Sequence, residues 1–236
     1  TDMNNCTLVG TAVAVPAGTI VASVAVGTGA SIFGNECIAV GYQAAATTNN
    51  ITVGVNSGSG LSTGEYNIAV GNSTLNNLTT GSYNIGIGWQ TLAQVDNATD
   101  NTAIGTNALT DLVSGNNNCA IGSAAMRNNS TGIGNVAVGN SSLNSITGSS
   151  SNVAVGMDAM FTLGAGDGNV AIGREALALG TAFDNNTVVG HAAMQNVTGS
   201  QNVAVGASAG GLSTDASSCT LIGYSLMFQI SLIDYE

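Results

Sequence analysis

The sequence has very little charge and few of the residue types from which active sites are built. Among its 236 residues there is no lysine, and the two arginines, Arg127 and Arg174, leave a formal net charge of −11. Charged residues make up 6% of the chain, whereas about a quarter is usual in globular domains. Two cations cannot neutralise a run of phosphate groups, so the composition argues against nucleic acid as a partner.

The scarcity of histidine and cysteine argues against catalysis. His191 is the only histidine, and no Ser-His-Asp or Cys-His arrangement can be argued around it. The four cysteines are too few for a disulfide scaffold and lack the close spacing of a zinc site. No apolar run approaches the ~18 residues that span a bilayer, because glycine or a polar residue interrupts each one. The sequence predicts no enzyme, no cofactor, no metal centre and no membrane insertion.

What the chain does contain is a repeated five-residue box of the form Asn, apolar, Ala, apolar, Gly. Examples are the segments 67–71 and 152–156. Counted by the closing glycine, the box recurs from Gly10 to Gly223, and eight consecutive steps between Gly54 and Gly190 are each 17 residues long. Chance does not produce this regularity, so the chain is a repeat protein.

A period of 17 residues predicts an all-β, parallel β-solenoid of about 14 coils. Helical repeats need more than about thirty residues, whereas 17 suffice for two short extended segments and two corners. The three apolar residues of each box are too few and too β-branched for a helix. Boxes stacked at about 4.8 Å make a rod on the order of 65 Å long.

Two columns of the repeat are interpreted as devices that shape the corners. Box asparagines stacked in register predict a ladder of amides bonded along the rod axis. The closing glycines predict a backbone conformation or a close approach that a Cβ atom would forbid. The ladder asparagines are Asn67, Asn84, Asn101, Asn118, Asn135, Asn152, Asn169, Asn186 and Asn202. The turn glycines are Gly71, Gly88, Gly105, Gly122, Gly139, Gly156, Gly173, Gly190 and Gly206.

The box strand is apolar at all three positions, which indicates burial on both of its faces. The large first and third residues, as in Val153 and Val155, are predicted to face the coil interior, with Ala154 between them facing out. The central alanines would then form a smooth stripe that packs against another chain, so a homo-oligomer is predicted. The stripe consists of Ala69, Ala103, Ala120, Ala137, Ala154, Ala171 and Ala204.

The four cysteines fall on the repeat. Cys6, Cys37 and Cys219 occupy the asparagine column, and Cys119 occupies an apolar slot that is predicted to face inward. They are interpreted as small buried residues.

Two acidic pairs are spaced by one repeat, so stacking would bring the members of each pair to about 5 Å. They are Asp158 with Glu175 and Asp167 with Asp184. This separation would suit an oxygen-rich cation site or a pair of glycosidase carboxylates. The favoured interpretation is an exposed acidic face, with the four residues as weak metal candidates. An ice-binding solenoid is a further alternative, but it needs a flat array of threonines, and the threonine column beside the second glycine of each coil is single and interrupted.

The chain divides into three parts. Residues 1–49 are predicted to form irregular N-terminal coils, because the glycine steps shorten there. Residues 50–223 are predicted to form the regular solenoid, and 224–236 a C-terminal cap or a connection to a further domain. Solenoid ends expose unpaired edges, which favours end-to-end contacts or neighbouring fibre domains.

The box followed by an Ala-Leu pair, as in the segment 101–109, resembles the head repeat of trimeric autotransporter adhesins and the related arrays of viral and phage tail fibres. The resemblance covers about 50–223. It implies a left-handed β-roll, a homotrimer, and an extracellular place on a virion, a tail fibre or a cell-surface appendage. The longer repeat favours the fibre over the adhesin head.

The sequence therefore predicts a structural segment of a viral or phage fibre that carries host-attachment functions, with a host-surface receptor as a further partner. The alternatives are a bacterial trimeric adhesin head and a self-assembling extracellular filament.

Overall fold

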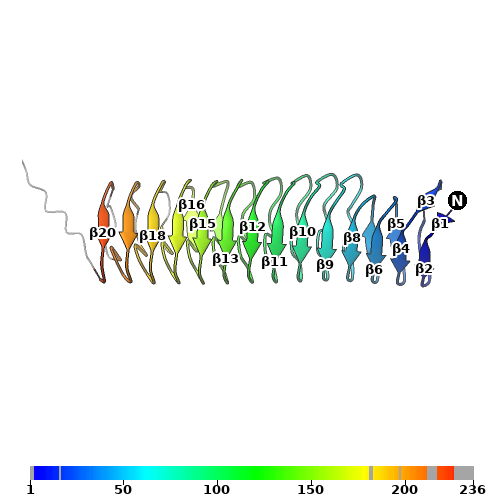
Figure 1. Cartoon of the computed structure of the whole chain (residues 1–236), viewed down its shortest axis with the longest axis horizontal. Helices are drawn as coiled ribbons and strands as arrows, with labels where there is room; N and C mark the ends of the chain where they lie inside the picture. The colour runs from blue at the N-terminus through cyan, green and yellow to red at the C-terminus, as the bar shows by residue number, and fades with distance from the viewer. Residues whose placement is uncertain (1–2, 16, 181–182, 197, 212–216, 226–236) are drawn as a thin grey trace, which may run out of the picture.

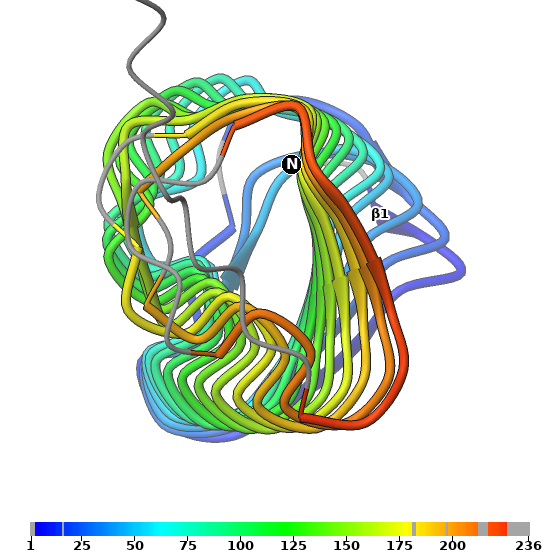
Figure 2. The ribbon, with the colours of Figure 1, turned by 90° about the vertical axis from the view of Figure 1, so that its left-hand side faces the viewer.

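The chain forms a straight rod of stacked coils. In this computed structural model, the described residues are 3–15, 17–180, 183–196, 198–211 and 217–225. Within them there is no helix, and the short strands of successive coils lie side by side along the rod (Figure 1). A view along the rod shows the coils superimposed, each turned slightly relative to the last (Figure 2). The predicted all-β parallel solenoid is confirmed.

One long parallel sheet runs the length of the rod. In the described part of the chain it contains 14 strands, each formed by one box and paired in register with the next. For example, Ile85, Gly86 and Ile87 pair with Thr102, Ala103 and Ile104. In order, the strands are β2 (Thr7–Val9), β4 (Val24–Val26), β6 (Ile38–Val40), β8 (Ile51–Val53), β9 (Ile68–Val70), β10 (Ile85–Ile87), β11 (Thr102–Ile104), β12 (Cys119–Ile121), β13 (Val136–Val138), β15 (Val153–Val155), β17 (Val170–Ile172), β18 (Thr187–Val189), β19 (Val203–Val205) and β20 (Thr220–Ile222).

Three two-stranded parallel pairs complete the strands of the described residues. They are β1 (Met3–Asn4) with β3 (Ile20–Val21), β5 (Ser31–Ile32) with β7 (Ala45–Ala46), and β14 (Ser145–Ile146) with β16 (Thr162–Gly164). Elsewhere the far side of each coil consists of turns bonded to the turns of adjacent coils, as in Leu92 N–H to Ala108 C=O at 3.1 Å. Backbone bonding along the axis therefore continues outside the main sheet.

Left-handed backbone conformations make the corners of each coil. Ser73, Leu75 and Tyr83 have φ of 54°, 51° and 60°, and the same three positions recur with positive φ in most later coils. Such conformations are uncommon for bulky residues. Leu75 is fully buried, so burial of its side chain offsets the backbone cost.

The interior of the rod is filled by the central residue of each box and by the large apolar residues opposite. Ala154 and the six other alanines of the predicted stripe are all 0% exposed. The prediction that these alanines face outward is therefore wrong, and so is the inward placement of Val153 and Val155. From Gly71 to Gly190, Leu or Met from the fourth position after each glycine already fills the interior, which leaves room for a small residue opposite in most coils. The stripe residues are Ala69, Ala103, Ala120, Ala137, Ala154, Ala171 and Ala204.

Two of the N-terminal coils are shorter than the regular ones, and the N-terminal coils have their own core. The glycine steps are 14 and 13 residues between Gly27 and Gly54. Buried apolar residues form one cluster from Ile20 to Ala46 and a second from Leu61 to Leu221. Between the clusters lie the buried polar residues Thr47, Asn50, Thr52 and Ser57, which hydrogen-bond to backbone carbonyls. Of the predicted C-terminal part 224–236, all but Tyr224 and Ser225 lies outside the described residues.

Candidate functional site

The box asparagines form a continuous hydrogen-bonded column inside the rod. The Asn84 backbone N–H and Nδ2 both donate to Oδ1 of Asn67, at 2.9 and 3.1 Å, and Nδ2 also donates to the Ala98 carbonyl at 2.8 Å. The backbone bond repeats at each step from Asn50 to Asn202, and Asn202 Oδ1 accepts from the Cys219 N–H at 3.0 Å. These amides are at most 1% exposed, so each one satisfies the backbone of its neighbours where water cannot reach.

The glycine column makes a close approach between adjacent coils. Gly122 has φ of +137°, and a Cβ atom built on it would lie 2.3 Å from the carbonyl oxygen of Gly139. The column has the same geometry from Gly10 to Gly206. The glycine is therefore required both by its backbone conformation and by the space.

A second ladder, which the sequence reasoning missed, lies two residues before the asparagine column. The backbone N–H of Thr99 donates to Oδ1 of Asn116 at 2.7 Å, and that of Asp167 donates to Oδ1 of Asp184 at 2.8 Å. The same bond recurs in other coils, where the acceptors are the hydroxyl oxygens of Ser82, Ser150, Ser200 and Ser217. The signal was present, since most coils have Ser, Asn or Asp at this position.

This ladder accounts for one of the two acidic pairs. Asp167 Oδ1 accepts the Ser150 N–H at 2.6 Å, and Asp184 Oδ1 accepts the Asp167 N–H at 2.8 Å. Both carboxylates border a shallow hollow with Thr147, but each already has a backbone donor. Their spacing therefore follows from a structural repeat.

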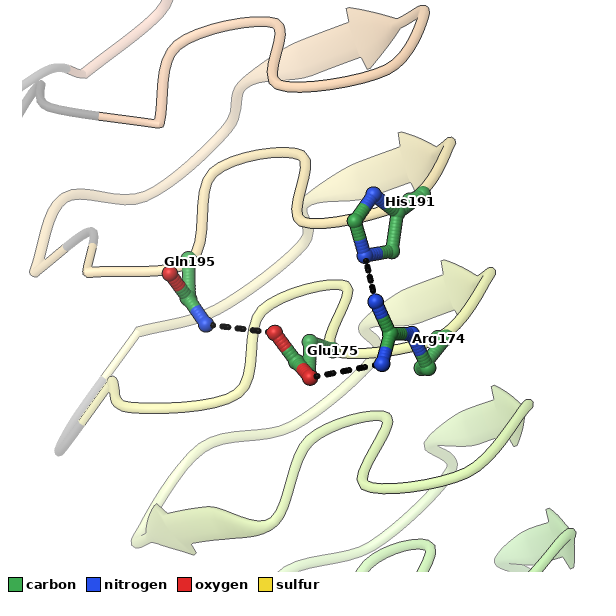
Figure 3. A network of polar contacts seen from close by, with 4 residues as sticks. All are labelled: Arg174, Glu175, His191 and Gln195. Atoms are coloured by element: carbon green, nitrogen blue, oxygen red, sulfur yellow. Dashed lines mark hydrogen bonds and ion pairs between the residues drawn. The ribbon is translucent and has the colours of Figure 1, made fainter.

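The other acidic pair belongs to a surface network. Asp158 and Glu175 line one hollow together with Phe161, Leu179 and Gln195. Gln195 Nε2 donates to Glu175 Oε2 at 3.0 Å (Figure 3). Glu175 Oε1 also lies 3.5 Å from Arg174 Nη1. The described residues contain no group of three or more His, Cys, Asp or Glu side chains that could hold a metal ion.

His191 lies in the same network. Its Nε2 is 2.6 Å from Nη2 of Arg174, which comes from the adjacent coil (Figure 3). Because the guanidinium can only donate, Nε2 accepts and the imidazole proton lies on Nδ1. This contact occupies the nitrogen that a general base would use.

The outer side of the main sheet is a uniform surface that runs along the rod. We define the outward face as the first and third residues of its 14 strands. No charged residue occurs at these positions, and nearly all of them are Val or Ile. Ile87, Ile172 and Ile222 are 39%, 41% and 68% exposed. The face includes only four threonines, Thr7, Thr102, Thr187 and Thr220, which is not the regular threonine array of an ice-binding surface.

Aromatic residues flank this face on both sides. We define the first border as the residues two positions before each strand, and the second border as those two positions after it. Tyr66 and Tyr83 on the first border stack with ring centroids 5.1 Å apart and planes at 7°. Tyr42 and Trp89 on the second border are 51% and 48% exposed. All four lie at the levels of β6, β9 and β10.

The cysteines occupy two environments. Cys119 is the first residue of β12, so it lies on the outward face, and its predicted inward placement is wrong. Cys37 is fully buried in the asparagine column, where its Sγ contacts the Gly34 carbonyl at 3.2 Å. Burial raises the pKa of the Cys37 thiol, opposed by a hydrogen bond to Ser23 and one to the Gly34 backbone.

The two environments predict different reactivity. With iodoacetamide at pH 8, and with the folded chain dilute enough to be monomeric, Cys119 should be alkylated, whereas Cys37 should react at least about 100-fold more slowly, because it is inaccessible and retains its proton. Peptide mass spectrometry of a labelling time course measures both rates in one sample. Equal rates for the two thiols would contradict this assignment, and unfolding in urea provides the control in which the difference should vanish.

Comparisons with known proteins identify no family for this chain. No protein-family model matches the chain, and no curated protein matches it either. No helix in the described part of the chain is long and apolar enough to cross a membrane. The repeat and the solenoid therefore stand as observations, and the fibre and adhesin resemblance stays a prediction.

Proposed function

We propose that this chain is a structural segment of an extracellular fibre, as found on viruses and phages, that holds attachment functions away from the particle. The observation that carries the proposal is the uninterrupted bonding along the rod axis. The main sheet, the asparagine column and the second ladder all repeat from coil to coil. In such a stack each coil is held by its two neighbours, so the array gains stiffness and stability with length.

The composition supports a passive role. With 6% charged residues, the chain offers few strong, specific polar contacts. The side chains of Arg174 and Glu175 are 52% and 31% exposed. Ion pairs this exposed contribute little to stability. The resemblance to fibre repeats supports a homotrimer, with a host-surface receptor and neighbouring fibre domains as further partners.

Electron microscopy of the purified chain tests the proposal. Negatively stained particles should be straight rods on the order of 65 Å long, with no bend at the boundary between the two core clusters. Native mass spectrometry of the same sample should give three chains per particle. Globular or bent particles would overturn the shaft, whereas straight particles joined end to end would favour the self-assembling filament.

A further inference from the structure

The outward face exposes a long apolar surface to solvent. Its two columns of mainly Val and Ile run along 14 strands of the described sheet without a charge. Contiguous exposed apolar patches of this size on soluble proteins mark interaction sites. Building on the proposed shaft, we propose that this face packs against other copies of the chain that run parallel and in register, and that the aromatic border residues fix the register.

The outward face and its two borders together have about the area of a standard protein–protein interface. Fourteen strands at about 4.8 Å, each about 10 Å long, cover on the order of 650 Å². A standard stable interface buries about 800 Å² on each partner. The two borders supply the remainder, because the exposed Tyr83 and Trp89 extend the apolar surface on both sides.

The distribution of charge favours a copy of this chain as the partner. With a net charge of −11, two copies repel one another unless the acidic groups stay away from the contact. Of the acidic residues in the described part of the chain, only Glu36 and Asp100 lie on a border. The others, including Asp111, Asp158 and Glu175, lie outside the face and its borders. A basic partner would find no charge on this face to bind.

The aromatic residues distinguish parallel from antiparallel packing. Tyr83 and Trp89 flank the same strand, β10, on opposite borders. When parallel copies are related by rotation about an axis along the rod, the second border of one copy meets the first border of the next at the same level. Trp89 then lies against Tyr83 of the neighbouring copy, next to the stacked Tyr66.

An antiparallel pair matches the aromatic residues poorly. With full overlap, the sixth strand of the sheet, β10, would face the ninth, β13. Like borders would then meet, with Trp89 opposite Asn140 and Tyr83 opposite Gly134. Each aromatic contact strengthens the affinity between two copies several-fold. The parallel arrangement, which forms this contact at every interface, is therefore favoured.

Thiol crosslinking tests the direction of the chains. Thr187 is exposed on the outward face at the start of β18. In a background with Cys6, Cys119 and Cys219 replaced by serine, Thr187→Cys should crosslink to itself with a short bismaleimide. Antiparallel copies would place it opposite Ile38 of β6, about 43 Å from its own equivalent. Crosslinking only in a mixture of Thr187→Cys and Ile38→Cys chains would overturn the parallel arrangement.

The border residues are tested by a matched pair of variants. Trp89→Ala should raise the concentration at which the oligomer dissociates about tenfold. Met157→Ala is the control, since Met157 lies on the same border with a similar exposure of 42% but faces no aromatic residue in the parallel arrangement. Equal dissociation of the two variants in analytical ultracentrifugation would overturn the role of the aromatic borders.

The outcomes separate this inference from the proposed shaft. A straight rod that stays monomeric at all concentrations would overturn the self-packing face and leave the shaft intact. A crosslinked oligomer of globular particles would overturn the shaft instead.

Discussion

Gly122→Ala is expected to destabilise the protein by about 4 kcal/mol, which sums the cost of a forbidden backbone conformation and of overpacking. Gly122 has φ of +137°, and an added Cβ would lie 2.3 Å from the oxygen and 2.6 Å from the carbon of the Gly139 carbonyl. Both contacts are to backbone, so no side chain can move aside. The two coils must separate locally, and the pairing of β12 with β13 should weaken.

Chemical denaturation followed by far-ultraviolet circular dichroism measures the loss. Gly134→Asn is the matched control, because Gly134 has φ of +68° and open space around its missing Cβ. Asn117 and Asn185 adopt the same conformation at the equivalent position, with φ of 58° and 57°, so this variant should lie within about 0.5 kcal/mol of the parent. Equal stability of the two variants would show that the glycine column is dispensable.

Asn118→Asp is expected to cost about 3 kcal/mol at pH 7, because it places an unpaired charge in the asparagine column. Asn118 Nδ2 donates to Asn101 Oδ1 at 3.1 Å and to the Gly132 carbonyl at 2.8 Å. A carboxylate would instead face these two oxygens without a proton. The bonds that Asn118 Oδ1 accepts from Asn135 would survive, which keeps the loss at the lower end for a buried charge.

The loss should shrink in acid. Burial and the two facing oxygens raise the pKa of the introduced carboxyl above its unfolded value. The folded variant therefore holds its proton more tightly than the unfolded chain, so its deficit relative to the parent is smallest below pH 4 and grows as the pH rises. Denaturation of both proteins at pH 3.5 and pH 7 measures this change.

The neighbouring Asn117→Asp is the control for charge alone. Asn117 is exposed, so its replacement should change stability by no more than about 0.5 kcal/mol at either pH. A deficit for Asn118→Asp that is independent of pH, or that is matched by Asn117→Asp, would contradict a buried ladder as the cause.

The sequence alone determined the period, the parallel stacking and the membership of the asparagine and glycine columns. Residues one repeat apart must lie one coil apart, so a column read from the sequence is a column in space. This reasoning needs no knowledge of the shape of a coil. For the same reason the acidic pairs could be found from the sequence. The backbone N–H groups that donate hydrogen bonds to Asp167 and Asp184 could not.

Only the tertiary structure decided which side of each strand faces the interior. Alternation along Val153, Ala154 and Val155 separates two sides, but both are apolar, and the larger side chains suggested the core. The interior is narrow because Leu or Met from the opposite wall fills it, so alanine lies inside and the valines lie outside. That choice depends on the width of the coil, which is set by its corners across the whole repeat and is not encoded in any single box. It turns the predicted alanine stripe into core and makes the Val and Ile columns the surface through which this rod can bind a partner.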